Sequence, residues 1–140
     1  MVLDDLQREF PESTVEAVRY LPGFFRLEGH VDIASSALYR DGRIFGIDVS
    51  SGVAVAALGI EPGDHCLDVC AAPGAKLCML AELCGQVGSV TGVDVSEERL
   101  ASCRTVVKKY GLDNVRLFLA DGTNFGVWAP TTAVSQLPSI

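Results

Sequence analysis

The stretch "LDVCAAPGAKLCMLAEL", residues 67–83, joins a short apolar run to a longer helix-forming run through a turn of small residues. The apolar run ends at Asp68, and the helix-forming run begins near Lys76. The turn between them contains one glycine, Gly74, and is otherwise built from Cys, Ala and Pro. A strand followed directly by a helix forms a βα unit, and the free N–H groups at the start of the helix favour an anionic group. This turn is therefore the first candidate for a ligand site.

Two further strand-and-helix patterns surround this stretch. The sequence predicts strands at 65–71, 89–95 and 115–121, and helices at 49–60, 75–84 and 96–110. Asp48 or Ser50 can cap the first helix, Ser96 can cap the last, and Gly111 can end it. Short apolar strands that alternate with helical patterns predict a parallel sheet covered by helices, which is an α/β fold.

The residues on either side of this region follow other patterns. We expect a small α+β segment over 1–47, followed by a ligand-binding domain over 48–125. The small segment is predicted to contain two short helices broken at Pro11, the second over 13–21, and a hairpin around Asp41-Gly42. The tail, 126–140, has no charged residue and is predicted to be irregular.

Charge and composition exclude several classes of protein. A formal net charge of −7 argues against a free-standing nucleic-acid-binding domain, which normally has a basic patch. We interpret the basic residues around the last helix as a solvated face; they are Arg99, Arg104, Lys108, Lys109 and Arg116. No apolar run reaches the roughly 20 residues of a membrane span, and the N-terminus resembles no export signal. We therefore expect an intracellular protein with no membrane partner.

The spacing of the five cysteines bears on whether the chain binds a metal or forms disulfides. They form no CxxC pair, and His30 and His65 are too far apart in sequence to complete a ligand set. The spacing therefore predicts neither a metal site nor a disulfide framework. Cys78 and Cys84 fall at apolar helix positions, where a free cysteine behaves as a small hydrophobic residue.

Carboxylates stand at the ends of all three predicted strands: Asp68, Asp94 and Asp121. Asp94 follows Gly74 by twenty residues, a spacing at which an acidic side chain can accept hydrogen bonds from a ribose. A dinucleotide would need the glycines of G-x-G-x-x-G, which are absent. S-adenosylmethionine has no phosphate and tolerates Ala in the loop. A βα unit without any ligand is the third alternative, which the aligned carboxylates disfavour.

The motif Asp68-Val69-Cys70-Ala71-Ala72-Pro73-Gly74-Ala75-Lys76 resembles the loop D-x-C-A-A-P-G-x-K of the Fmu/Sun-type RNA (cytosine-5) methyltransferases. The segments "GVDVSEERL" (92–100) and "LADGT" (119–123) are similar to that family's second-strand and third-strand motifs, and 42–68 is similar to the segment leading into the loop. The resemblance covers roughly residues 20 to 125. One departure is Ala75-Lys76-Leu77, where the family often has Gly-Lys-Thr.

The resemblance implies part of a Rossmann-like methyltransferase fold and S-adenosylmethionine as cofactor. The loop backbone would hold the methionine end of the cofactor; its residues are Cys70, Ala71, Ala72, Pro73, Gly74, Ala75 and Lys76. Lys76 would lie near the carboxylate, Asp94 would bind the ribose hydroxyls, and Asp121 would lie beside the adenine. Arg99 would close the ribose side, or would instead pair with a neighbouring Glu. Cys70 is interpreted as the entry residue of the loop and not as a nucleophile.

The chemistry of this family also needs two cysteines. A thiolate adds to C6 of cytosine so that C5 can accept the methyl group, and a second cysteine assists release of the product. In the family these lie in a Pro-Cys and a Thr-Cys motif, and neither dipeptide occurs in this sequence. We therefore predict no catalytic residue and no methyl transfer by this chain alone. The resemblance implies RNA (rRNA or tRNA) as the substrate of a full-length form, in the nucleus, nucleolus or cytoplasm.

The strand at 65–71 is central in the parent fold, so its far edge is expected to be open here. Leu67, Val69 and Ala71 would then be exposed, and an open apolar edge permits self-association. A non-catalytic scaffold that retains the fold, such as a short isoform, and a small-molecule methyltransferase are the alternative functions.

Overall fold

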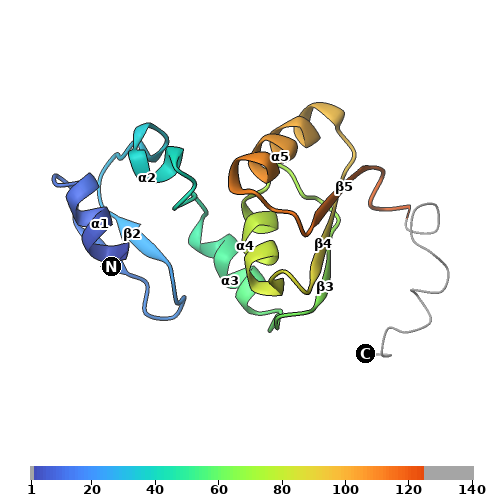
Figure 1. The fold of residues 1–140 in the computed structure, drawn as a ribbon, viewed down its shortest axis with the longest axis horizontal. Coiled ribbons are helices and arrows are strands. Elements are labelled where there is room, and N and C mark those ends of the chain that lie inside the picture. Colours follow the sequence, from blue (N-terminus) through green and yellow to red (C-terminus); the bar gives the residue numbers. More distant parts are fainter. Residues whose placement is uncertain (1, 125–140) are drawn as a thin grey trace. The chain divides into compact units, whose positions relative to one another are not determined.

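The computed structural model describes residues 2–124, which form two compact units. The first unit extends to Gly59 and the second begins at Ile60 (Figure 1). By its contacts the helix that precedes Gly59 belongs to the first unit. The division of the sequence into 1–47, 48–125 and 126–140 stays a prediction, and the tail 126–140 lies outside the described residues.

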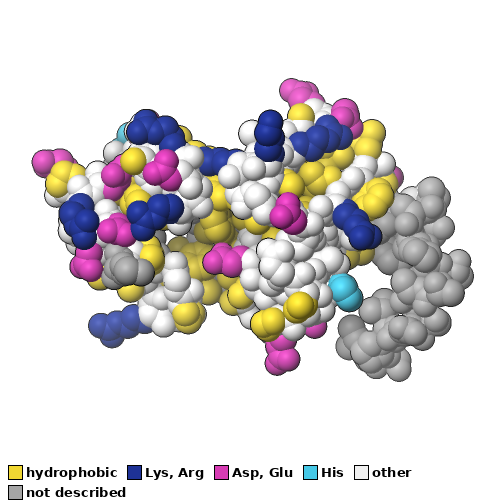
Figure 2. All heavy atoms as spheres, viewed as in Figure 1, with side chains coloured by type: hydrophobic (Ala, Val, Ile, Leu, Met, Phe, Trp, Pro, Cys, Tyr) yellow, Lys and Arg dark blue, Asp and Glu magenta, His cyan; other side chains and the backbone are white. Residues whose placement is uncertain are grey.

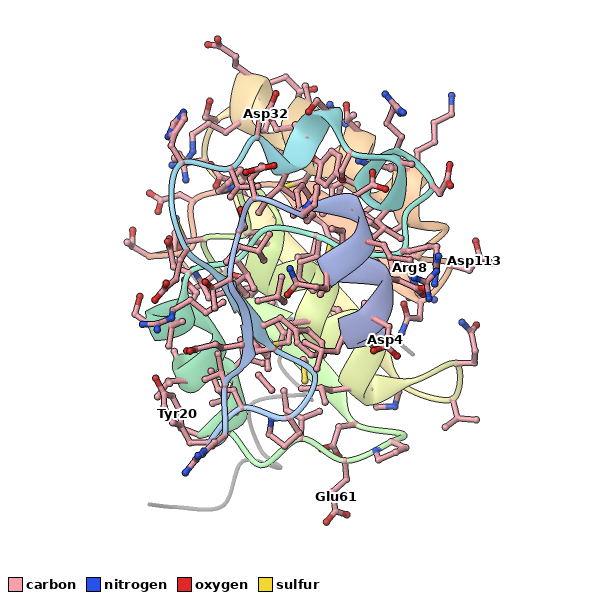
Figure 3. All side chains as sticks on the ribbon, turned by 90° about the vertical axis from the view of Figure 1, so that its left-hand side faces the viewer. Asp4, Arg8, Tyr20, Asp32, Glu61 and Asp113 are labelled. Atoms are coloured by element: carbon pink, nitrogen blue, oxygen red, sulfur yellow. The ribbon has the colours of Figure 1, made fainter. Side chains whose placement is uncertain are left out.

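The first unit combines short helices with one antiparallel strand pair. Its elements are α1 (Val2–Glu9), β1 (Val15–Ala17), β2 (Phe25–Leu27), η1 (Ile33–Ser35), α2 (Ala37–Arg40) and α3 (Val49–Ala56). Leu6, Val15 and Leu38 are buried together and join α1, β1 and α2 in one small core. Asp4 and Arg8 lie on the outward side of α1, and α1 confirms the first of the two predicted short helices (Figure 3).

The predicted helix over 13–21 is wrong. Val15 pairs with Leu27 across two antiparallel strands, and the N–H of Val18 donates to the carbonyl of Phe24 (2.9 Å). Val15 is β-branched and buried, a combination that favours a strand. The turn around Pro22 connects the two strands.

The predicted hairpin around Asp41-Gly42 is also wrong. Gly42 follows α2 and has a φ of 70°, in the left-handed region. Its N–H donates to the carbonyl of Tyr39 (3.1 Å), and the N–H of Arg43 donates to the carbonyl of Leu38 (2.9 Å). These two bonds form a Schellman motif, in which a glycine ends a helix. Asp-Gly is therefore a helix terminus here and not a hairpin turn.

The second unit is a three-stranded parallel sheet with two helices. Its elements are β3 (His65–Asp68), α4 (Ala75–Cys84), β4 (Ser89–Asp94), α5 (Glu97–Tyr110) and β5 (Val115–Leu119). The strand order is β3-β4-β5, with β4 in the middle. The two helices lie side by side on one face of the sheet (Figure 1). This arrangement confirms the predicted α/β fold, and each predicted strand and helix of this region is present.

The ends of α5 and the start of α3 follow the expected capping signals in part. The hydroxyl of Ser96 accepts the N–H of Arg99 (3.3 Å) and so caps α5, and Gly111 ends that helix. Asp48 stands at the cap position of α3, but its side chain makes no cap hydrogen bond.

The core of the second unit lies between the sheet and the helices. The fully buried apolar side chains there include Leu77, Val90, Leu100 and Cys103. Cys78 and Cys84 are buried as well, which confirms their predicted core positions. Gly92 lies under α4, where an added Cβ would stand 2.8 Å from Leu117 and 3.0 Å from Leu77. The central strand therefore needs a glycine for the helix to approach this closely.

The sheet face opposite the helices has exposed apolar side chains. Within the described chain β3 pairs only with β4, and Leu67 and Val69 are 42% and 48% exposed, as predicted. Ala71 is only 3% exposed, so that part of the prediction is wrong. Its N–H donates to the carbonyl of Val93 (2.9 Å), which turns the methyl group beneath Gly92. No helix within residues 2–124 is long and apolar enough to cross a membrane.

Candidate cofactor site at the ends of β3 and β4

The loop that joins β3 to α4 is held against the end of the neighbouring strand. The N–H of Cys70 donates to Asp68 Oδ1 (3.1 Å), and the N–H of Ala72 donates to Asp94 Oδ2 (3.2 Å). Gly74 has a φ of 112°, and an added Cβ would stand 3.4 Å from Val106 of α5. The loop is thus fixed by backbone hydrogen bonds and by close contact with α5, without bulky side chains.

Asp94 is the buried centre of this site. It is 2% exposed at the end of the middle strand, and its two oxygens accept the N–H groups of Ser96 (3.1 Å) and Ala72 (3.2 Å). Burial alone would raise the pKa of Asp94, but these hydrogen bonds and the charge of Arg99 outweigh burial and lower the pKa. Asp94 is therefore an ionised carboxylate at neutral pH.

Arg99 bridges the first turn of α5 to the loop. Its guanidinium donates to the carbonyl of Ala72 (3.0 Å) and lies 3.4 Å from Asp94 Oδ2. The same nitrogen lies 3.8 Å from the sulfur of the exposed Cys70. In this structure the ion-pair partner of Arg99 is Asp94, and the neighbouring Glu97 is paired with Arg104 (2.6 Å).

Asp68, the last residue of β3, has a buried carboxylate oxygen next to the loop. Its Oδ2 is buried and has no hydrogen-bond partner among residues 2–124. Burial raises the pKa of Asp68, and the nearby negative charge of Asp94 raises it further. The hydrogen bond from the Cys70 N–H and the positive charge of Lys76 act in the opposite direction but do not cancel the rise. An acceptor buried without a donor costs about 1–3 kcal/mol, so a donor on a bound molecule would remove a penalty. The sequence analysis placed Asp68 at a strand end but predicted no ligand contact for it. Its position directly before the loop was the feature that could have indicated such a contact.

The segment after β5 reaches the same edge of the sheet. The N–H of Ala120 donates to the carbonyl of Asp94 (3.1 Å), and an added Cβ on Gly122 would stand 2.8 Å from the carbonyl of Val69. Asp121 is exposed between these two residues, and hydrogen bonds from Thr123 lower its pKa. Lys76 is exposed in the first turn of α4. The predicted residues thus border one edge, where Arg99 contacts Asp94, Ala72 and Cys70, and Asp94 also contacts Ala72.

Charge on the surface is mixed. Figure 2 shows Lys and Arg side chains interspersed with Asp and Glu side chains on the visible face. On α5, Arg104 pairs with Glu97, and Lys109 lies over the ring of Tyr110 (5.2 Å). No group of three or more His, Cys, Asp or Glu side chains that could hold a metal is found in the described part of the chain.

A parallel sheet with a small-residue loop and a buried carboxylate at adjacent strand ends defines a Rossmann-like nucleotide-cofactor domain. The family model "16S rRNA methyltransferase RsmB/F" matches residues 55–136, more than half of the chain. The chain belongs to this methyltransferase family, which confirms the resemblance seen in the sequence.

The named relatives to which the chain is similar are also described as rRNA methyltransferases. The chain is 34% identical over 97 residues to the ribosomal RNA small subunit methyltransferase B of Pseudomonas syringae pv. tomato. That match covers 69% of this chain and 21% of the relative. The chain is also 33% identical to the 28S rRNA (cytosine-C(5))-methyltransferase of Mus musculus, over 66% of this chain and 20% of that relative. The chain therefore spans about a fifth of the length of these relatives.

Solved structures agree on the fold. A methyltransferase homologue from Pyrococcus horikoshii superimposes with a TM-score of 0.76 at 29% identity, covering 89% of this chain and 42% of that one. NSun6 from the same organism, solved with SFG, superimposes with a TM-score of 0.62 at 26% identity, over 66% of this chain and 24% of that one. These matches confirm the Rossmann-like methyltransferase fold.

Proposed function

We propose that this chain is the S-adenosylmethionine-binding segment of an rRNA cytosine-C5 methyltransferase. The observation that carries the proposal is the ionised, buried Asp94 hydrogen-bonded to the small-residue loop. The names of the curated relatives support rRNA as the substrate class. Such a substrate places the protein inside the cell, in the cytoplasm, nucleus or nucleolus.

Each site residue has a proposed role. The backbone of residues 70–76 holds the methionine end of the cofactor, with Lys76 near its carboxylate. Asp94 accepts the ribose hydroxyls on the lone pairs that Ser96 and Ala72 leave free, and Asp121 borders the adenine. The unpartnered Asp68 Oδ2 fits the ammonium group of the methionine end, because that group is a charged donor. When bound, the cofactor supplies an electrophilic methyl group on its sulfonium.

Arg99 is proposed to act through other residues. Its contacts with the Ala72 carbonyl and with Asp94 hold the loop and the ribose-binding carboxylate in fixed positions relative to each other. Its side chain is half exposed, so the ion pair with Asp94 adds little free energy by itself and mainly fixes geometry.

We further propose that this 140-residue chain binds the cofactor without methylating RNA. Cytosine C5 needs a thiolate adduct at C6 before it attacks a methyl group. The sequence has no Pro-Cys or Thr-Cys motif, and Cys70 belongs to the cofactor loop.

Titration calorimetry with S-adenosylmethionine tests the binding role. The unmodified chain and the Asp113→Asn control, altered at an exposed residue after α5, should bind; Asp94→Asn should bind weakly or not at all. Equal binding by Asp94→Asn would contradict the site. A methyl-transfer assay on an rRNA fragment should show no turnover by the isolated chain, and sustained turnover would refute the second part of the proposal.

A non-catalytic scaffold is the second candidate. The observation in its favour is the exposed apolar face of the sheet, where Leu67, Val69 and Phe118 are 42%, 48% and 51% exposed. Such a surface beside the open edge of β3 permits self-association. Gel filtration of the chain and of Leu67→Lys tests it: a concentration-dependent dimer that the variant abolishes, combined with no cofactor binding, would favour the scaffold.

A further inference from the structure

Two of the five cysteines lie side by side across β3 and α4. The thiol of Cys84, the last residue of α4, donates to the sulfur of Cys66 at 3.4 Å. Cys84 is fully buried, and Cys66 is partly exposed. A disulfide has an S–S length of about 2.05 Å, so closing the bond requires the sulfurs to approach by about 1.3 Å.

The backbone around this pair is fastened on two sides. The N–H of Gly63, just before β3, donates to the carbonyl of Cys84 (2.8 Å). The side-chain amide of Asn114 donates to the carbonyls of Ala81 (2.8 Å) and Gly85 (3.0 Å) at the same end of α4. The end of the helix therefore cannot leave the strand without breaking several hydrogen bonds, which holds the two sulfurs together in the folded state.

We propose that Cys66 and Cys84 form a latent disulfide that a low-molecular-weight disulfide such as oxidised glutathione closes. The thiolate of Cys66 attacks the glutathione disulfide, which gives a mixed disulfide and releases one glutathione thiolate. Cys84 loses its proton to solvent and displaces the second glutathione as a thiolate. The protein loses two electrons and two protons, and the oxidised glutathione is reduced to two thiols.

The bond would enclose residues 66–84, and hence the whole cofactor loop, in one ring. Cys66 is the second residue of β3, and the loop begins beyond the other end of that strand. The ring therefore closes away from Asp94 and the loop backbone. Burial, with the neighbouring Cys84 thiol, raises the pKa of Cys66 to about 11, so the exchange is expected to be slow at neutral pH and faster in alkaline buffer.

The test is oxidation of the folded chain with oxidised glutathione in mildly alkaline buffer, followed by mass spectrometry without reduction. The intact chain should lose two hydrogen atoms and retain no glutathione. Lys76 is the only basic residue between Cys66 and Cys84, so trypsin should yield linked peptides that carry these two cysteines. A glutathione adduct that never closes, or a random set of linked peptides, would overturn the proposal.

Matched variants assign the bond. Cys66→Ser and Cys84→Ala should abolish the cross-link, whereas Cys70→Ser and Cys78→Ser, which alter the other cysteines on the same two peptides, should retain it. A cross-link that persists in Cys66→Ser would overturn the assignment. The oxidised chain should also melt at a higher temperature than the reduced chain, and a lower melting temperature would contradict the geometry. None of these results depends on cofactor binding.

Discussion

Asp94→Asn is the most informative single substitution, because it keeps the shape of the side chain and removes its charge. Both carboxylate oxygens accept backbone N–H groups, one from Ser96 and one from Ala72. An asparagine offers only one acceptor oxygen, so its NH₂ group must face one of these two donors. The substitution therefore leaves either the buried N–H of Ala72 or the partly buried N–H of Ser96 without an acceptor.

The magnitude follows from these contacts. One buried donor left unpaired costs about 1–3 kcal/mol. The half-exposed Arg99 loses its partner, which adds less than about 1 kcal/mol. We expect a loss of about 2–3 kcal/mol in the free energy of unfolding. If Asp94 also accepts ribose hydroxyls, the lost charged hydrogen bonds, at about 1.5–3 kcal/mol, correspond to roughly a 10- to 150-fold weaker Kd.

Urea unfolding followed by circular dichroism measures the first quantity, and titration calorimetry measures the second. The denaturation midpoint should fall with an unchanged m-value. Asp113→Asn, an exposed change of the same chemistry, should leave both quantities within about 0.5 kcal/mol of the unmodified chain. An Asp94→Asn chain as stable as this control would refute the hydrogen-bond argument, and one that binds S-adenosylmethionine equally well would refute the cofactor role.

Three further outcomes are expected. Because folding lowers the pKa of Asp94, its ionised carboxylate should stabilise the fold fully above about pH 4, and this stabilisation should be lost as the pH falls further. Unfolding measured over a series of acidic pH values, in the unmodified chain and in Asp94→Asn, tests this. Gly92→Ala should destabilise the fold by about 1–3 kcal/mol in urea unfolding, because its Cβ meets Leu117 and Leu77; no loss would contradict the packing. Gly42→Ala should lower the melting temperature because Gly42 has a positive φ. Gly46→Ala, at a glycine with open space and no positive φ, should not lower it, and equal effects of the two substitutions would argue against the Schellman motif.

The second unit was predictable because each signal in it has one physical meaning. Short apolar runs between helical patterns require a covered parallel sheet, and Ser96 and Gly111 cap and end α5 as expected. In the first unit, α1 and α3 were predicted correctly, but the signals between them are ambiguous. Asp-Gly serves a helix end as well as a hairpin, and the pattern around Val15 fits either a short helix or a strand.

The candidate site was predictable in its main positions but not in its contacts. Strand ends and spacing singled out Asp94 and the loop. The contact of Arg99 with the Ala72 carbonyl and the unpartnered oxygen of Asp68 depend on backbone positions that are distant in sequence. Sequence spacing carries no information on such contacts, so they became visible only in the folded chain.

The double use of Asp94 limits how this domain can change. The carboxylate proposed to bind the ribose is also the acceptor that fastens the loop, so a substitution at this residue cannot alter ligand affinity without weakening the fold. Lys76 and Asp121 border the same edge but are exposed, and neither anchors the buried loop. We therefore expect affinity to be adjustable at these two residues, in evolution or by engineering, while residue 94 stays constrained to aspartate.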